Sequence, residues 1–221
     1  MDALRFVTAT SLFDGHAASI NIFRRLLQAR GAEVIHLGHN RSVDASVDAA
    51  VAEDAHAVAV TSYQGGHLEF FRYLDERLTA AGADSVAVFG GGGGTILPTE
   101  IEALRSEGVA HLYSPDDGRT MGLEGMVDDM IARSTRHERD LSAGTPGQLH
   151  TGDHRALAMA ITAVENHADK YSELIDSRIL EANALATPVI GITGTGGAGK
   201  SSLTDELIRR LVLGDHRRTI A

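Results

Sequence analysis

Residues 4–30 read LRFVTATSLFDGHAASINIFRRLLQAR. The apolar run over 4–10 predicts a strand, and a loop of small and polar residues follows it. Apolar residues such as Ile20 and Phe23 then recur at helical spacing, which predicts a helix over 17–30. A strand that leads through a short loop into an amphipathic helix is the repeating unit of parallel α/β proteins.

The same strand–loop–helix pattern recurs along the chain up to about residue 135. The further predicted strands span 33–37, 57–62, 86–89 and 109–113, and the further predicted helices span 43–51, 68–81, 98–107 and 122–133. Such a series predicts a flavodoxin-like, doubly wound α/β fold with a parallel five-stranded sheet covered on both faces. Ligands of this fold bind beyond the carboxyl ends of the strands. The loops of interest are therefore 11–16, 62–67, 90–97 and 114–118.

Composition excludes several classes of function. The formal net charge of -10 argues against nonspecific nucleic-acid binding, which needs basic patches. The sequence has no cysteine, so disulfides, thiolate metal sites and cysteine nucleophiles are excluded. Neither a secretory signal nor an apolar stretch of roughly 18 residues is present. We expect a cytoplasmic protein without a membrane or nucleic-acid partner.

Asp14 and His16 stand two residues apart in the loop that follows the first strand. A neutral imidazole is a good ligand for a transition metal, and its second nitrogen usually donates to a carboxylate or carbonyl. Asp14 can supply that carboxylate. These two residues alone leave an alternative open, in which Asp14 simply caps the helix that follows and His16 is an exposed loop residue. A receiver domain with Asp14 as phosphoacceptor requires a lysine after the fifth strand, but the first lysine of the sequence is Lys170.

The Asp-x-His pattern and the loops after the third, fourth and fifth strands resemble the cobalamin-binding domain of methylmalonyl-CoA mutases and cobalamin-dependent methionine synthases. The resemblance implies that His16 is the lower ligand of the cobalt, in place of the cofactor's own dimethylbenzimidazole. It implies that Ser62 hydrogen-bonds the displaced nucleotide tail and that missing side chains at the glycine run make room for it. The implied cofactor-binding residues are Asp14, Gly15, His16, Ser62, Gly65, Gly66, Gly90, Gly91, Gly92 and Ser114.

Two positions depart from the family pattern. Ser19 stands where the family commonly has glycine, and Gln64 stands where it has leucine. The other histidines of this region lack an Asp-x-His context, and we expect them to be surface or loop residues rather than ligands. They are His36, His39, His56, His67 and His111.

The chain changes character after residue 135. Residues 136–153 lack apolar periodicity and contain Gly144, Pro146 and Gly147, so we predict a linker between a first domain, 1–135, and a second, 154–221. In the second domain the pattern predicts a long helix over 154–185 broken near Ser177, a strand over 188–193, a helix over 201–213 and the start of a strand over 219–221.

A phosphate-binding loop connects the predicted strand 188–193 to the helix that follows. Residues 194–201 read GTGGAGKS and match G-x-x-x-x-G-K-[ST] at every fixed position. In this motif backbone N–H groups and the helix N-terminus surround phosphates, the lysine reaches the β- and γ-phosphates, and the hydroxyl binds Mg²⁺. The predicted nucleotide-binding residues are Gly194, Gly197, Ala198, Gly199, Lys200, Ser201 and Ser202, with Ser201 as the magnesium ligand.

A cobalamin domain followed by a phosphate-binding loop resembles the fused isobutyryl-CoA mutase family. The resemblance implies adenosylcobalamin, GTP with Mg²⁺, an acyl-CoA substrate bound by a barrel domain absent from this sequence, and a homodimer for the full-length protein. The implied reaction interconverts isobutyryl-CoA and n-butyryl-CoA. Because only about 20 residues follow Ser201, we expect a part of a longer protein with negligible nucleotide hydrolysis. A non-catalytic cobalamin carrier or sensor coupled to a nucleotide switch is the alternative.

Overall fold

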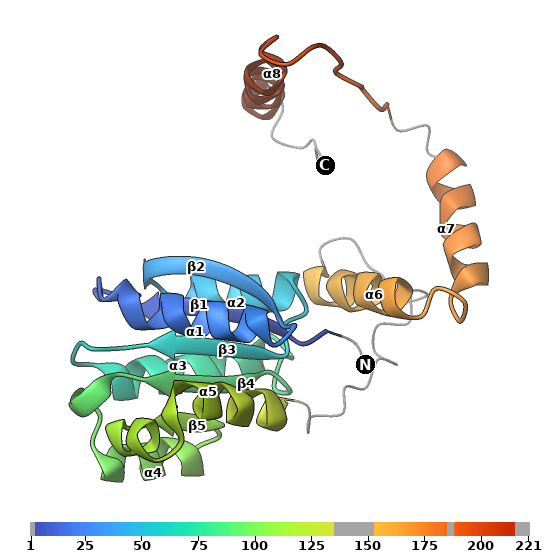
Figure 1. The fold of residues 1–221 in the computed structure, drawn as a ribbon. Coiled ribbons are helices and arrows are strands. Elements are labelled where there is room, and N and C mark those ends of the chain that lie inside the picture. The colour runs from blue at the N-terminus through green and yellow to red at the C-terminus, as the bar shows by residue number, and fades with distance from the viewer. Residues whose placement is uncertain (1–2, 135–152, 185–187, 215–221) are drawn as a thin grey trace. The chain divides into compact units, whose positions relative to one another are not determined.

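The computed structural model of the chain describes residues 3–134, 153–184 and 188–214. Its sheet has five parallel strands in the order β2-β1-β3-β4-β5 (Figure 1). The strands are β1 (Arg5–Ser11), β2 (Glu33–Arg41), β3 (Ala57–Thr61), β4 (Ala87–Gly91) and β5 (His111–Tyr113). The predicted flavodoxin-like fold is confirmed. In this order the connections after β1 run to opposite sides of the sheet, so β1 and β3 flank the point at which the strand order reverses. Ligands of such folds bind at that point.

Helices cover both faces of the sheet. One face carries α1 (Ala17–Ala29) and α5 (Pro115–Ser134), and the other carries α2 (Val43–Ala52), α3 (His67–Ala80) and α4 (Pro98–Ser106). A short 3₁₀ helix, η1 (Gly93–Thr95), follows β4. Side chains of each strand point alternately to the two faces. Val7 and Val58 therefore pack with α2 and α3, whereas Phe6 and Phe89 pack with α1 and α5.

Most element boundaries predicted for the sheet and its helices agree with the structure within two residues, but β2 runs to Arg41 rather than to residue 37, and one helix start differs for a local reason. Ser42 caps α2 as expected, because its hydroxyl accepts a hydrogen bond of 3.2 Å from the Ala45 N–H. Helix α5 begins at Pro115 rather than at Gly122. Gly122 has φ +68° and ψ 175°, which interrupts the helix. The predicted start at residue 122 is therefore the second half of a kinked helix.

Helix α6 (His154–Asn166) belongs to the first of two compact units, which divide after Ser172. Ala160 and Ala163 are buried on its apolar face, and the helix lies against α2. The predicted break near Ser177 is wrong. The chain leaves α6 after residue 166, makes a turn in which the Lys170 N–H donates to the His167 carbonyl, and starts α7 (Ser172–Ala184).

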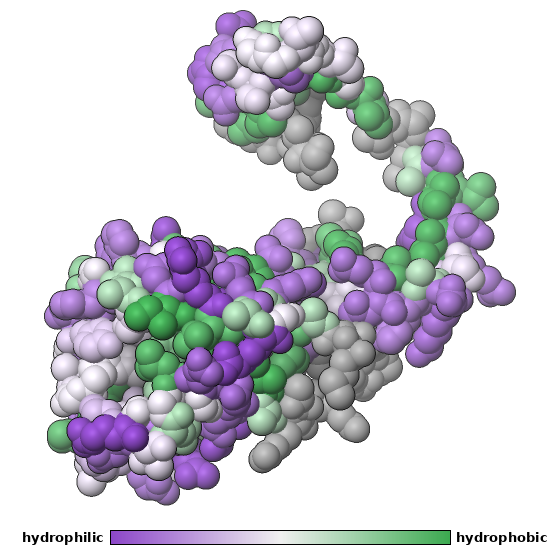
Figure 2. Space-filling model, in the orientation of Figure 1, coloured by the Kyte–Doolittle hydropathy of each residue, from purple (hydrophilic) through white to green (hydrophobic). Residues whose placement is uncertain are grey.

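The second unit, residues 173–221, contains most of α7 and helix α8 (Lys200–Gly214). The predicted strand over 188–193 does not form among the described residues. A strand needs a neighbour for its backbone N–H and C=O groups, and the described part of this unit offers none. Apolar side chains of the segment 188–193 are exposed to solvent, and Val189 is 94% exposed. Apolar surface is also visible on α7 (Figure 2). The predicted strand start at 219–221 lies outside the described residues.

No helix within the described ranges has both the length and the hydropathy that crossing a lipid bilayer requires.

Candidate functional site

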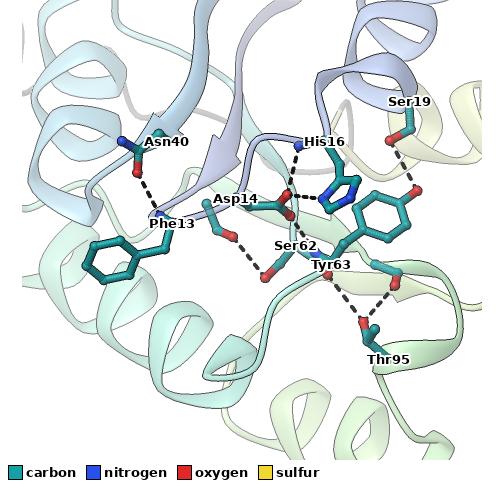
Figure 3. Close-up of polar contacts among 10 residues, drawn as sticks. Phe13, Asp14, His16, Ser19, Asn40, Ser62, Tyr63 and Thr95 are labelled. Carbon is teal, nitrogen blue, oxygen red and sulfur yellow. Dashed lines mark hydrogen bonds and ion pairs between the residues drawn. The ribbon is translucent and has the colours of Figure 1, made fainter.

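The loop between β1 and α1 holds a histidine by a buried carboxylate. Asp14 is fully buried, whereas the side chain of His16 is 66% exposed. Asp14 Oδ1 lies 2.7 Å from His16 Nδ1 and also accepts the His16 N–H at 2.8 Å, as Figure 3 shows. A hydrogen on Nδ1 that points to the carboxylate leaves the lone pair of a neutral imidazole on Nε2. The imidazole is thus oriented to offer Nε2 as a ligand.

The other oxygen of Asp14 ties this loop to the loop after β3. Asp14 Oδ2 accepts a hydrogen bond of 2.5 Å from the Tyr63 N–H. Burial by itself raises the pKa of the Asp14 carboxyl, but the hydrogen bonds from Tyr63 and His16 outweigh it and hold the pKa below its ordinary value. Asp14 is therefore ionised at neutral pH. A buried carboxylate with both oxygens engaged is not available as a phosphoacceptor, which argues against a receiver domain.

The backbone of the β1–α1 loop is held in an unfavourable conformation. Phe13 has φ +65°, a region that bulky residues rarely adopt. Its N–H donates to Asn40 Oδ1 at 2.7 Å, and the Asn40 N–H donates to the Asp14 carbonyl at 3.1 Å. The end of β2 thus fixes the loop that carries His16. Backbone strain of this kind tends to occur at functional sites.

A cavity of about 180 Å³ opens beside this loop, between the sheet and helices α1 and α5. It is lined by Ser19, Ile20, Phe23, Ala59, Val60, Thr61, Tyr63, Phe89, Gly90, Gly91, Gly92, Gly93, Tyr113, Ser114, Leu123, Met126 and Met130. The lining is mostly apolar, so the cavity suits a flat organic group rather than a bare ion. Burial, together with a 2.9 Å hydrogen bond to Asp129, raises the pKa of the Tyr113 phenol, which stays neutral.

Thr61 is a residue of the cavity lining that sequence reasoning missed. Its hydroxyl is buried and has no hydrogen-bond partner within the described part of the chain. Such a group is costly unless a ligand or water satisfies it. Ser62, the residue singled out from the sequence, does not line the cavity, and its hydroxyl accepts a 2.9 Å hydrogen bond from Ser11. The alternation of β3, which puts Ala59 and Thr61 on one face, is the signal that could have identified Thr61.

Two glycines of the run at the end of β4 are required by the protein's own packing. A Cβ on Gly90 would lie 2.2 Å from Phe71 Cζ, and a Cβ on Gly92 would lie 1.7 Å from the Ser62 carbonyl oxygen. Room for a ligand, the reason implied by the family resemblance, is therefore not needed to explain glycine at these two positions. The backbone of both residues, and that of Gly91, still lines the cavity.

The remaining predicted cofactor residues lie around the same edge. Ser114 lines the cavity, and its hydroxyl donates to Asp117 at 2.7 Å in the first turn of α5. Gly66, with φ +85°, begins α3, whereas a Cβ on Gly15 or Gly65 would have no neighbour within 4 Å. His67 is buried rather than at the surface, because its Nε2 pairs with Glu100 at 2.9 Å.

The predicted phosphate-binding loop leads directly into α8. Gly197 and Gly199 have φ of +76° and +79°, conformations that favour glycine. Lys200 Nζ donates to the carbonyls of Gly194 and Thr195 at 2.9 Å and 2.8 Å, so the lysine folds back over the loop. Ser201 and Ser202 follow in the exposed first turn of α8. The structure thus brings the predicted nucleotide-binding residues together in one loop and one helix start.

Comparison with known proteins identifies the first unit. The family model of the B12 binding domain matches residues 4–117. The chain belongs to this family. The β1–α1 loop, the cavity and the glycine run of the B12-binding domain all lie within or beside the matched residues. A solved cobalamin-binding protein from Desulfitobacterium hafniense is similar at a TM-score of 0.49 and 23% identity, over 59% of this chain and 58% of that one.

Relatives also cover the part of the chain beyond the B12-binding domain. The model of the methylmalonyl-CoA mutase-associated GTPase MeaB matches residues 157–221. The chain is a homologue of the fused isobutyryl-CoA mutases, with 58% identity to that of Cupriavidus metallidurans and 51% to that of Geobacillus kaustophilus, each over 95% of this chain. It spans only 19% and 20% of the length of these two relatives.

The MeaB match and the compact units divide the chain at different places. The match begins inside α6, whereas α6 belongs to the first compact unit. The domain limits predicted from the sequence, 1–135, 136–153 and 154–221, therefore stay a prediction.

Proposed function

We propose that this chain binds adenosylcobalamin with His16 as the protein ligand to cobalt. The Asp14–His16 pair is the observation that carries the proposal, because a buried, ionised carboxylate orients an exposed imidazole at the edge of the sheet. Within the described ranges no group of histidine and acidic side chains could hold a metal ion by itself. A single histidine suits a metal whose other ligands come from a macrocycle. When bound, adenosylcobalamin supplies the radical chemistry, and the protein supplies ligation and positioning.

The cavity beside His16 is the proposed site of the nucleotide tail of the cofactor. Its apolar walls from α1 and α5 match the flat base of the tail, and the unpartnered Thr61 hydroxyl offers the base a hydrogen bond. The proposed contacts are His16 and Thr61 with Asp14, Gly15, Ser62, Gly65, Gly66, Gly90, Gly91, Gly92 and Ser114.

For the second unit we propose GTP with Mg²⁺ at the loop before α8. Lys200 would exchange its two backbone carbonyl partners for phosphate oxygens, and Ser201 would bind the metal. Guanine rather than adenine rests on the match to a GTPase family.

The activity that these sites serve is proposed to be that of the long relatives. We infer that the chain is the cofactor- and nucleotide-binding region of a cytoplasmic, homodimeric acyl-CoA mutase that interconverts isobutyryl-CoA and n-butyryl-CoA. Identity of 58% and 51% to two mutases over nearly the entire chain favours this role over a non-catalytic carrier or sensor.

The test compares His16→Ala with His39→Ala, a change at an exposed histidine on β2. We expect His16→Ala to weaken cobalamin binding by more than about tenfold, or to leave the cofactor ligated by its own benzimidazole, as read from the visible spectrum. The electron paramagnetic resonance spectrum of bound cob(II)alamin should change when the histidines of the parental chain carry the heavier nitrogen isotope. Unchanged spectra and affinity in His16→Ala would contradict the proposal.

A further inference from the structure

Two hydroxyl groups meet on a part of the cavity lining that is partly exposed to solvent, which we call the mouth. The Tyr63 hydroxyl donates to Ser19 Oγ at 3.1 Å, which joins the β3–α3 loop to the first turns of α1 (Figure 3). Both residues line the cavity, and the Tyr63 ring centroid lies 5.5 Å from that of His16. The phenol therefore links the β3–α3 loop to α1 at this mouth, beside the proposed cobalt ligand.

The Tyr63 N–H is bound by Asp14, whereas its side chain makes one hydrogen bond among the described residues, at the tip of the ring. The Tyr63 N–H is bound by the buried carboxylate of Asp14, so the loop cannot move away without disturbing the support of His16. The ring packs over Gly93, where a Cβ would lie 3.1 Å from Tyr63 Cε1. Beyond this packing, the bond to Ser19 is the polar contact that holds the ring in place. Side-chain rotation of Tyr63 is thus the way to open the mouth without moving the loop.

We propose that Tyr63 and Ser19 form a latch that closes the cavity and must open before the nucleotide tail of cobalamin enters. The inference rests on the proposed function. Serine at position 19 supplies the hydroxyl that accepts the hydrogen bond of the phenol. A closed state that dominates the free protein lowers the fraction competent to bind, and so slows entry of the tail.

Stopped-flow absorbance on the 221-residue chain mixed with hydroxocobalamin tests the latch, because loss of benzimidazole ligation reports entry of the tail. Tyr63→Phe keeps the ring but removes the hydrogen bond, and we expect entry to become about fivefold faster. Ser19→Ala should accelerate entry to a similar degree, and the double variant should be no faster than either single one. Tyr73→Phe, at a half-exposed tyrosine of α3, is the matched control and should leave the rate unchanged.

Each outcome separates the latch from the proposed function. Entry at the parental rate in both single variants would overturn the latch, and additive acceleration in the double variant would show that the two hydroxyls do not act as a pair. Slower entry and weaker affinity in Tyr63→Phe would mean that the hydroxyls bind the tail instead of blocking it. If the parental chain itself never binds cobalamin, the proposed function fails before the latch is tested.

Discussion

Two buried threonine hydroxyl groups of the sheet differ in their surroundings. Thr10 and Thr61 lie on neighbouring strands, and both are buried with hydroxyls that have no hydrogen-bond partner in the described part of the chain. An unsatisfied buried hydroxyl destabilises the folded state. Thr61 belongs to the cavity lining and Thr10 does not, so a ligand in the cavity would lie closer to the Thr61 hydroxyl.

Thr61→Val and Thr10→Val form a matched pair that tests this difference. Both changes remove an unsatisfied hydroxyl at nearly constant volume, so we expect both variants to resist urea as well as the parental chain or better. Only Thr61→Val should weaken cobalamin binding, by about fivefold in a spectroscopic titration. Equal cobalamin affinity in the two variants would mean that the Thr61 hydroxyl does not contact the cofactor.

The loops that follow β3 and β4 are bound to each other by hydrogen bonds at the carboxyl end of the sheet. The Ser62 N–H donates to the Gly91 carbonyl at 2.8 Å, and Thr95 of η1 bonds back to the carbonyls of Gly92 and Ser62. Because Gly92 lies directly against the Ser62 backbone, the absence of a side chain at Gly92 sets the spacing between the loops that follow β3 and β4. The cavity edge depends on that spacing.

Gly92→Ala and Gly94→Ala therefore separate packing from mere loop flexibility. A methyl group at position 92 would meet the Ser62 carbonyl, whereas at the exposed Gly94 it meets nothing within 4 Å. We expect Gly92→Ala to lower the free energy of unfolding by roughly 2 kcal/mol and to weaken cobalamin binding. Gly94→Ala should change neither by a measurable amount. If Gly94→Ala is as harmful as Gly92→Ala in urea unfolding, general flexibility of the run is what matters.

Two compact units carry the two proposed ligand sites. The unit that ends at Ser172 contains His16, the cavity and helix α6. The unit that follows contains the loop before α8. No α8 residue is buried within the described part of the chain, so this unit forms no core of its own there. Each site is nevertheless assembled from contacts inside its own unit, which predicts independent binding of the two ligands.

Lys200→Ala tests this independence, with the only other lysine of the sequence, Lys170, changed to alanine as the control. Loss of the charged donor should weaken binding of a fluorescent GTP analogue at least about tenfold, because hydrogen bonds to charged groups are among the stronger ones. Cobalamin affinity and spectrum should stay at parental values in both variants. A change of the cobalamin spectrum in Lys200→Ala would show that the units are coupled within this chain.

Features that depend on neighbours along the chain are determined by the sequence alone. The strand and helix periods of the first unit, the pairing of His16 with Asp14 two residues away, and the contiguous loop before α8 all follow from local spacing. The break after residue 166 is local too, yet the sequence pattern misplaced it, because the polar turn 167–171 carries no strong stop signal such as glycine or proline.

Contacts between distant segments required the fold. The orientation of β3 against α1 and α5 decides which side of the strand faces the cavity. It therefore decides that Thr61, and not Ser62, lines the cavity. The meeting of Ser19 with Tyr63 depends on the packing of α1 beside the β3–α3 loop, and that of Gly92 with Ser62 depends on the register between β3 and β4. Spacing along a chain encodes which face of an element is apolar, but the distance between two loops exists only once the elements are packed, and that packing placed the cavity beside His16.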